Sequence, residues 1–366
     1  MSAYVARADR LAQRVEELGL DLLLVSHLVN VRYLTGFTGT NGAFLVGPGH
    51  RVFLTDFRYV ERAKEEVPDF DRVRGREDML ESALEIALDA GDGREGRVRL
   101  GFDDSHMTVR AHAKLAELAG DRVELVRAGG LAEDLRAVKD EAEVSAIRAS
   151  TAIADDLYRW LISEHGLAGK SEHEVAVALE RRAQDHGADG LSFPAIVAAG
   201  ANGALPHATP RRDAVIPRDT LVVVDLGCML DSYCSDCTRT FATGEIDAEA
   251  RDCYELVRTA QEAALAVTQP GADVREVDRV ARDAIAAAGH GDQFGHGLGH
   301  GVGLEVHEAP RLGPTASGSL EAGNVVTIEP GVYVPERFGI RIEDLVLVRA
   351  EGPQVMTSIP KELIVV

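Results

Sequence analysis

The chain has 366 residues, 45% of them hydrophobic, and its 39 Lys and Arg against 60 Asp and Glu give a formal net charge of −21 at pH 7. This excess of negative charge repels phosphate backbones and anionic lipid surfaces, so neither nucleic acid nor a membrane is an expected partner. The N-terminal stretch lacks the uninterrupted apolar core of a signal peptide, and no segment approaches the ~20 apolar residues of a membrane-spanning helix. We therefore expect a cytoplasmic protein with a packed core.

The first part of the chain alternates between helical and strand-like patterns. Amphipathic spacing predicts helices at 5–18, 57–66, 78–90 and 108–119. Short apolar runs between turn residues predict strands at 21–26, 42–47, 51–56, 97–103 and 122–126. Such alternation is typical of an α/β domain, which we place at residues 1–130. Two glycines and a charged helix start then indicate a linker and helix start at 131–142.

The remaining residues, 143–366, are predicted to form an α+β domain. Long helices are predicted at 140–164, 172–186, 247–268 and 273–288. Strands are predicted near 193–199, 220–227, 233–241, 303–307, 324–329 and 340–348. Because these strands follow one another as hairpins rather than in strict βαβ alternation, the sheet is expected to be largely antiparallel.

The four cysteines fall within 26 positions, at Cys228, Cys234, Cys237 and Cys253. They are too few for a disulfide framework, so reduced thiols are expected. Cys234 and Cys237 form a C-x-x-C pair, but no second pair follows at the spacing of a zinc ribbon. We therefore expect small buried strand residues rather than a structural zinc site or a redox pair.

Residues 295–308, GHGLGHGVGLEVHE, place three histidines and two glutamates among five glycines. The stretch lacks the His-Glu-x-x-His spacing of a zinc-protease helix. A dinucleotide-binding loop is also disfavoured, because the glycines run into a strand-like segment, Gly303 to Val306, rather than into a helix. If the histidines bind metal, glycine would allow the backbone to come close to the ions.

Two aspartates emerge from the apolar segments of TLVVVDLGCMLDSYCSDCTRTF. A two-residue turn at Leu230 and Asp231 would place Asp225 directly opposite Asp236. Like charges in such a pair are destabilising unless a cation lies between them. The pattern therefore favours a bound metal, and a pair of solvent-facing acids is the alternative.

A second pair of acids occurs in NVVTIEPGVYVPERFGIRIEDLVLV. Pairing Val332 with Ile340 would bring Glu329 opposite Glu343. Arg341 lies two residues before Glu343 on the same strand face, where its guanidinium could orient a ligand carboxylate. A plain surface arginine is the alternative for this residue.

Four carboxylates and one imidazole make an oxygen-rich ligand set. Such a set suits Mn²⁺, Co²⁺, Fe²⁺ or Zn²⁺, and two ions would neutralise its charge. One histidine of residues 295–308 can supply the nitrogen ligand. The other histidines would then be available for acid, base or oxyanion-stabilising roles.

The whole chain resembles the proline-specific pita-bread metallopeptidases, which include Xaa-Pro dipeptidase (prolidase) and Xaa-Pro aminopeptidase and are related to creatinase and methionine aminopeptidase. NVRYLTGFTGTNGAFLV and TDFRY resemble the creatinase-type N-terminal domain. VVDLG, SDCTRTF, GHGLGHGVGLEVHE, TIEPGVY and GIRIED follow in the order found in the catalytic domain. The resemblance implies a creatinase-like α/β domain followed by an α+β pita-bread catalytic domain.

Carried over by position, the resemblance implies a dinuclear metal site with Mn²⁺ as the first expectation. The implied metal ligands are Asp225, Asp236, His300, Glu329 and Glu343. The implied catalytic residues are His207, His307 and Glu329, and the residues implied to lie near the substrate are His207 and His296. In this family a hydroxide shared by the metals attacks the carbonyl before proline. Short proline-containing peptides are the implied substrates, and a homodimer is expected by analogy.

Two questions stay open within this resemblance. A creatinase-like C–N hydrolase or a non-catalytic peptide-binding relative is the rival function, but creatinase and the non-catalytic relatives lack the ligand set found here. Dipeptidase and aminopeptidase activity are both compatible with the motifs. Arg311, four residues after His307, could bind the carboxylate of a dipeptide and so favour dipeptides over longer peptides. A solvent-exposed or interface arginine is the alternative.

Overall fold

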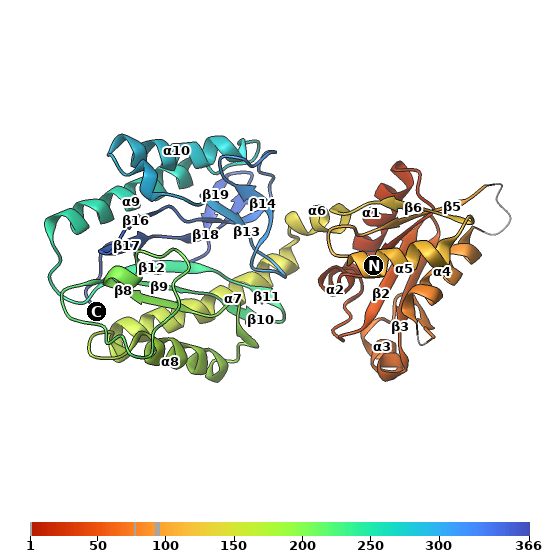
Figure 1. Ribbon diagram of the computed structural model, residues 1–366, viewed down its shortest axis with the longest axis horizontal. Helices are drawn as coiled ribbons and strands as arrows, with labels where there is room; N and C mark the ends of the chain where they lie inside the picture. Colours follow the sequence, from red (N-terminus) through yellow and green to blue (C-terminus); the bar gives the residue numbers. More distant parts are fainter. Residues whose placement is uncertain (1, 77, 92–95) are drawn as a thin grey trace. The chain divides into compact units, whose positions relative to one another are not determined.

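The computed structural model describes residues 2–76, 78–91 and 96–366 (Figure 1). The chain divides into two compact units, Met1–Arg136 and Ala137–Val366. The division falls near the end of α6, inside the predicted linker of residues 131–142. Within the described residues, no helix is long and apolar enough to cross a lipid bilayer.

The first unit is built around one mixed six-stranded sheet with the strand order β4-β3-β2-β1-β5-β6. Its strands are β1 (Leu22–Val25), β2 (Gly42–Gly47), β3 (His50–Thr55), β4 (Asp71–Arg74), β5 (Val98–Phe102) and β6 (Val123–Arg127). Its helices are α1 (Ala3–Glu17), α2 (Leu28–Thr35), α3 (Val60–Glu66), α4 (Met79–Ala90), α5 (Val109–Ala119) and α6 (Leu131–Ala137). Every residue of the apolar strand β1 is buried, as expected of a central strand. The predicted α/β arrangement is confirmed, although α2 and the exposed edge strand β4 were not predicted.

The second unit combines antiparallel strands with two pairs of long helices. The helices are α7 (Glu141–Trp160), continued by a π-helical turn (Leu161–His165), α8 (Glu172–Asp185), α9 (Ala248–Val267) and α10 (Val274–Ala287). The strands are β7 (Gly190–Leu191), β8 (Ile196–Ala199), β9 (Leu221–Leu226), β10 (Cys228–Leu230), β11 (Tyr233–Cys234), β12 (Cys237–Ala242), β13 (Gly299–Gly301), β14 (Glu308–Leu312), β15 (Val325–Ile328), β16 (Gly331–Val334), β17 (Phe338–Arg341), β18 (Asp344–Arg349) and β19 (Gly352–Val355). Capping boxes at Asp140 and Ser171 fix the starts of α7 and α8.

The strands of this unit lie between the two helix pairs, with α9 and α10 on one side and α7 and α8 on the other (Figure 1). A three-stranded sheet, β12-β9-β8, and a five-stranded sheet, β14-β13-β15-β18-β19, supply most of the strands. One hydrophobic core joins α9 and α10 to β15 and β18, and a second joins α7 and α8 to β9. The predicted antiparallel α+β architecture is confirmed. The four cysteines are buried and free, as expected, but Cys253 lies on helix α9 and not on a strand.

The register predicted for the first acidic hairpin is wrong. The turn is formed by Asp231 and Ser232, with φ of 50° and 68°, and not by Leu230 and Asp231. Asp225 therefore pairs with Thr238 rather than with Asp236. The shift moves the pairing by two positions, so Asp225 and Asp236 still lie on the same face of the hairpin.

The register predicted for the second acidic hairpin is confirmed. Val332 pairs with Ile340 between β16 and β17, and Ile328 pairs with Asp344 between β15 and β18. Glu329 directly follows the paired Ile328, and Glu343 directly precedes the paired Asp344. The two glutamates are therefore adjacent where the strands of the two sheets meet.

The strand predicted at 303–307 is not formed, because these residues make a series of bends. The glycines before them form strand β13 instead. A Cβ atom on Gly299 would lie 2.0 Å from the carbonyl oxygen of Thr327, and one on Gly301 would lie 2.1 Å from that of Ala309. Glycine is therefore required at these two positions by the close approach of neighbouring strands, which accounts for Gly299 and Gly301 without the proximity to metal suggested by the sequence.

Candidate metal centre and active site

The second unit encloses a cavity of about 650 Å³. Every site residue proposed from the sequence lines this one cavity, namely His207, Asp225, Asp236, His296, His300, His307, Arg311, Glu329, Arg341 and Glu343. Its apolar wall is formed by Phe193, Pro194, Ile196, Leu312, Pro314 and Ala316. The cavity thus joins a charged group of side chains to an apolar surface, as small-ligand sites commonly do.

His300 on β13 lies at the centre of the acidic side chains. Its Nε2 is 3.2 Å from Glu329 Oε1 and 3.7 Å from Asp236 Oδ2. Donor atoms of Asp236, His300 and Glu343 all lie within 4.8 Å of one another. The His300 Nδ1 is 3.1 Å from the carbonyl oxygen of Gly301, to which it can donate. With Nδ1 facing this carbonyl oxygen, Nε2 is the ring atom directed at the acids. It hydrogen-bonds to Glu329 when no metal is bound, and after losing its proton it could bind an ion.

The four carboxylates, which we call the acid cluster (Asp225, Asp236, Glu329 and Glu343), are held apart from bulk water. Burial and the neighbouring carboxylates raise the pKa values of Asp236 and Glu343 well above their ordinary range. Burial disfavours the charge of Glu329 too, but the hydrogen bond and charge of His300 outweigh it and lower the pKa to about 2. The cluster is therefore strongly destabilised by its own charge unless cations are present.

One oxygen of each of three acids is held by a protein donor. Arg341 Nη2 donates to Asp225 Oδ2 at 2.6 Å, and Thr238 Oγ1 donates to Glu343 Oε2 at 2.6 Å. Thr327 Oγ1 donates to Glu329 Oε1 at 3.0 Å. Asp225 Oδ1 and Glu343 Oε1 are buried and have no hydrogen-bond partner within the residues that the structure describes. Buried anionic oxygens of this kind need a cation, so the donor set fits divalent metal ions.

Arg341 connects the acid cluster to His296. The side chain of Arg341 is 4% exposed, which excludes a surface arginine. Its Nη1 donates to the hydroxyl of Tyr333 at 2.7 Å, which leaves the hydroxyl proton available to His296 Nε2, 3.0 Å away. His296 Nδ1 then donates to the carbonyl oxygen of Gly297 at 2.8 Å. The chain of donors assigns a neutral His296 protonated on Nδ1, in agreement with a pKa lowered by burial.

Sequence reasoning missed Tyr333 and Thr238. Both could have been found from strand register, because Tyr333 shares a strand face with Gly331, the partner of Arg341, and Thr238 is the partner of Asp225. The signal became usable only once the pairing of each hairpin was known.

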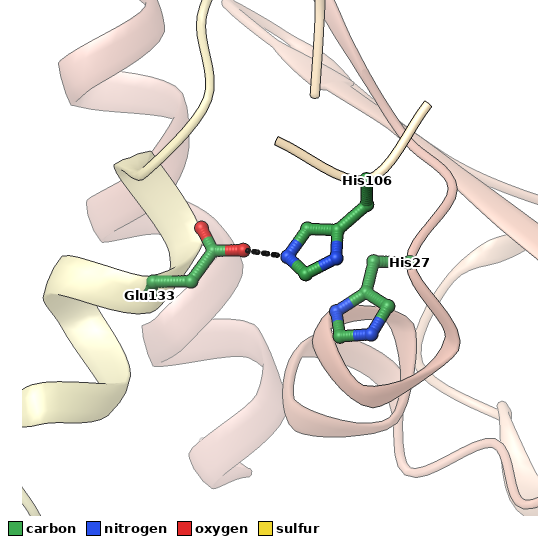
Figure 2. Close-up of side chains that lie close together, drawn as sticks. All are labelled: His27, His106 and Glu133. Carbon is green, nitrogen blue, oxygen red and sulfur yellow. Dashed lines mark hydrogen bonds and ion pairs between the residues drawn. The ribbon is translucent and has the colours of Figure 1, made fainter. Parts of the chain in front are cut away.

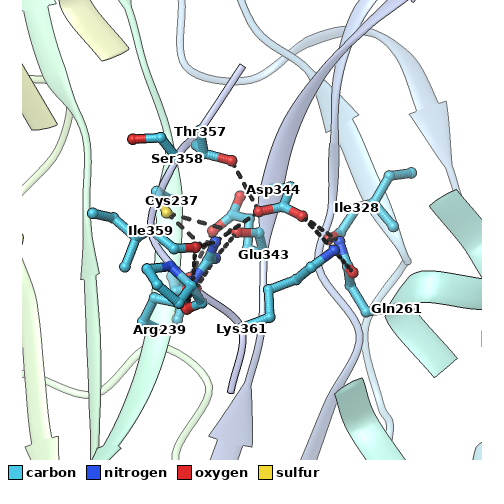
Figure 3. A network of polar contacts seen from close by, with 12 residues as sticks. Cys237, Arg239, Gln261, Ile328, Glu343, Asp344, Thr357, Ser358, Ile359 and Lys361 are labelled. Carbon is cyan, nitrogen blue, oxygen red and sulfur yellow. Dashed lines mark hydrogen bonds and ion pairs between the residues drawn. The ribbon is translucent and has the colours of Figure 1, made fainter. Parts of the chain in front are cut away.

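Behind the acid cluster lies a second buried network, centred on Asp344 (Figure 3). Arg239 Nη2 donates to Asp344 Oδ1 at 2.8 Å, and Lys361 Nζ lies 3.0 Å from Oδ2. Arg239 also donates to the backbone carbonyl oxygens of Glu343 and Ile359. The network therefore ties the C-terminal segment to the backbone of a residue in the acid cluster, and the sequence patterns did not reveal it.

His307 and His207 are exposed side chains on the cavity wall. The His307 ring lies edge-on to His300, with 4.3 Å between the ring centroids. Burial and the charge of His300 lower the pKa of His307. The loop that carries His307 is fixed by the buried pair of Lys139 and Glu308, with 3.1 Å between Nζ and Oε2. Glu308 Oε1 also accepts a hydrogen bond from the backbone N–H of Glu305 at 3.0 Å.

Arg311 lies on β14, where it pairs with His300 on β13. Its side chain is exposed and lines the cavity, and its charge contributes to the lowered pKa of His307. The guanidinium is therefore placed at the same wall as the histidines, within the reach of a small ligand.

Comparison with known proteins agrees with this geometry. Residues 145–350 match metallopeptidase family M24, and residues 7–138 match the creatinase/prolidase N-terminal domain. The peptidase YqhT of Bacillus subtilis is 38% identical over 359 residues, which are 98% of this chain and 99% of that protein. The structure of an Xaa-Pro dipeptidase from Bacillus anthracis has a TM-score of 0.93 and 35% identity, covering 99% of this chain and 100% of the other. That of an X-Pro aminopeptidase from Thermotoga maritima has a TM-score of 0.88 and 32% identity, covering 98% and 99%.

Proposed function

The chain belongs to metallopeptidase family M24, and from this membership we propose that it hydrolyses the peptide bond between an N-terminal residue and a following proline. The observation that carries the proposal is the convergence of the acid cluster, four histidines and Arg311 on one cavity of about 650 Å³. Cavities of this size bury small ligands such as a dipeptide. The names of the two solved relatives, a dipeptidase and an aminopeptidase, support the same bond and leave substrate length open.

We propose that Asp225, Asp236, His300, Glu329 and Glu343 hold two divalent ions. Mn²⁺ is the first candidate, and Co²⁺, Fe²⁺ and Zn²⁺ are the others. The two partnerless oxygens, Asp225 Oδ1 and Glu343 Oε1, support this assignment. When bound, such ions supply the Lewis acidity that activates water for hydrolysis at neutral pH.

The residues around the ions have separate tasks. His307 and His207 are assigned to hydrogen bonds with the oxygen of the scissile carbonyl, where negative charge develops in the transition state. A lowered pKa keeps His307 neutral at pH 7, so its ring offers one N–H donor. Glu329 is assigned to proton transfer, because its side chain is 16% exposed, against 11% for Asp225 and 7% for Asp236.

We assign the preference for dipeptides over longer peptides to Arg311. A dipeptide that ends in proline carries its carboxylate close to the scissile bond, and a guanidinium can bind a carboxylate through two parallel hydrogen bonds. The position of Arg311 on the cavity wall beside His307 supports this role. We therefore propose that the protein is an Xaa-Pro dipeptidase, with His296 and the apolar wall contacting the rest of the substrate.

The test compares Leu-Pro with a tripeptide that begins with Leu-Pro, in the presence of Mn²⁺ or Co²⁺. Wild type is expected to cleave Leu-Pro, and Arg311→Ala to raise KM for Leu-Pro by about 10-fold or more, since a charge-assisted hydrogen bond contributes roughly 1.5–3 kcal/mol. KM for the tripeptide should change less. Arg212→Ala removes an exposed arginine that does not line the cavity, and it should change neither value. A wild type that cleaves only the tripeptide would show an aminopeptidase and remove the carboxylate role of Arg311.

A further inference from the structure

A second group of histidine and carboxylate side chains lies in the first unit. His27, His106 and Glu133, which we call the first-unit cluster, each offer a ligand atom, and these atoms lie within 4.8 Å of one another. His106 Nε2 is 3.0 Å from Glu133 Oε1 (Figure 2). The three residues come from different segments, since His27 precedes α2, His106 precedes α5 and Glu133 lies on α6. The mechanism proposed above uses none of them.

The carboxylate of Glu133 is positioned by a buried amide. Asn30 is fully buried, and its Nδ2 donates to Glu133 Oε1 at 2.7 Å and to Asp103 Oδ2 at 3.3 Å. Arg136 Nη1 donates to Asn30 Oδ1 at 2.7 Å, which fixes the orientation of the amide because arginine can only donate. The carboxylates of Glu133 and Asp103 thus both accept a hydrogen bond from the buried Asn30 Nδ2, beside the His106 ring.

Asp103 supplies an independent observation. The residue is 4% exposed, and its Oδ1 has no hydrogen-bond partner in the part of the chain that the structure describes. Burial and the negative charge of Glu133 raise the pKa of Asp103. An ordinary hydrogen-bonded pair of His106 and Glu133 explains the contact between those two residues, but it leaves a buried carboxylate oxygen beside a second carboxylate. A bound cation would balance the negative charge of both Asp103 and Glu133.

We propose that His27, His106 and Glu133 bind one divalent transition-metal ion, whose charge the buried carboxylate of Asp103 would help to balance. Two imidazoles and one carboxylate are a ligand set used for Zn²⁺, with the fourth position left to water or another ligand. The 3.0 Å between His106 Nε2 and Glu133 Oε1 is close to the ~3.4 Å expected of two atoms each about 2.1 Å from one tetrahedral ion.

Binding requires one local rearrangement. The rings of His27 and His106 are stacked, with 3.6 Å between centroids and 4° between planes. A metal lies in the plane of the imidazole that binds it, so two parallel rings cannot both direct a lone pair at one ion. The ring of His27 therefore turns out of the stack when the ion binds, while His106 and Glu133 already lie at a suitable separation.

The test counts zinc in the full-length protein after equilibrium dialysis against a fixed micromolar concentration of free Zn²⁺. Wild type is expected to hold one zinc ion per chain more than Glu133→Gln and than His106→Gln. Glu133→Gln keeps an oxygen that can accept from Asn30, so the fold is expected to survive. His112→Gln changes an exposed histidine of α5 outside the cluster and should hold as much zinc as wild type.

Because the count is a difference between variants, zinc in the acid cluster cancels and the result does not depend on the proposed peptidase activity. Circular dichroism and a melting curve establish which variants are folded. If Glu133→Gln does not fold, His106→Gln decides the question. Equal zinc in wild type and a folded cluster variant would overturn the proposal, as would loss of the same ion in His112→Gln.

Discussion

Glu343 and Asp344 are neighbours in the chain and each is 1% exposed, yet their carboxylates are in opposite electrostatic situations. Asp344 accepts hydrogen bonds from Arg239 and Thr357 on one oxygen and from Gln261 on the other, which also lies 3.0 Å from Lys361 Nζ. Glu343 accepts from Thr238 on Oε2, while its Oε1 has no partner in the described residues. Successive residues of a strand point to opposite faces, so one backbone serves both networks.

This comparison shows which of the two buried acids needs a bound metal ion to balance its charge. Arg239 and Lys361 lower the pKa of Asp344 although burial acts against them, so its charge is compensated within the protein. Burial and the other acids raise the pKa of Glu343. Asp344 therefore stabilises the fold by itself, whereas Glu343 is an unfavourable charge that becomes useful when metal ions bind.

The largest expected effect comes from breaking the acid cluster. Asp236→Ala should lower kcat/KM for Leu-Pro by roughly 10³-fold or more, since metal ions supply several kcal/mol of transition-state stabilisation. The variant should hold less metal by elemental analysis. Its metal-free form should be at least as stable as metal-free wild type, because a repelling charge is gone. Asp252→Ala, an exposed acid on α9, is the control and should retain both metal and activity. Full activity in Asp236→Ala with depleted metal would refute the assignment.

The same comparison can be made on stability alone. Asp344→Ala leaves Arg239 buried without its carboxylate, so the free energy of unfolding should fall by about 3–5 kcal/mol. Glu343→Gln in the metal-free protein should leave that free energy equal or higher, because it removes one charge of a repelling group. Urea denaturation of both variants without metal measures the two values. A larger loss in Glu343→Gln than in Asp344→Ala would reverse our interpretation of the two networks.

Variants of His307 and His300 distinguish a residue that contacts the substrate from one that binds the metal ions. His307→Ala should keep the metal content of wild type, while kcat falls by roughly 10²-fold, the scale of a lost oxyanion donor. His300→Ala should lose metal, because His300 Nε2 lies 3.2 Å from Glu329 Oε1 inside the ligand set. If His307→Ala loses metal as readily as His300→Ala does, the two roles have been exchanged.

The pH dependence of stability should differ between metal-free and metal-loaded protein. The pKa values of Asp236 and Glu343 are raised in the folded state from ordinary values of 3.8 and 4.5. Above those ordinary values the unfolded chain releases the protons first, so these groups make the metal-free fold less stable as pH rises, by at most about 1.4 kcal/mol per pH unit for each group. Asp344, with a lowered pKa, acts in the opposite direction and loses its contribution as pH falls below about 4.

Chemical denaturation between pH 5 and pH 8 checks this sign. Metal-free Glu343→Gln should show a shallower decline than metal-free wild type, and metal should suppress the decline in wild type. A metal-free wild type that becomes more stable across this range would contradict the raised pKa values.

The fold could be predicted where periodicity carried the signal, and the residues that the motifs singled out all line one cavity. The pairing of Val332 with Ile340 followed from alternating strands, and it brought Glu329 beside Glu343. The turn of the other hairpin failed, because Asp231 and Ser232 both adopt positive φ without the Asn-Gly or Asp-Gly pair that usually announces such a turn. The predicted register was wrong by two residues. Because this is an even number, Asp225 and Asp236 were still placed correctly on the same face of the hairpin.

The networks beyond the motifs could not be predicted, because their partners are distant in sequence. Arg239 reaches Ile359 across 120 positions, and nothing local in either segment indicates the contact. His106 and Glu133 are likewise in contact although α5 and β6 lie between them in the chain. Local pattern predicts elements and faces, whereas contacts between distant side chains depend on tertiary packing.

The most direct test of a metal-dependent peptidase is Leu-Pro hydrolysis before and after chelation. The account predicts that wild type stripped of metal does not cleave Leu-Pro and recovers when Mn²⁺ or Co²⁺ is added. Stripped Asp236→Ala should not recover under the same conditions, although it remains folded. Undiminished cleavage by metal-free wild type would contradict the role assigned to the acid cluster.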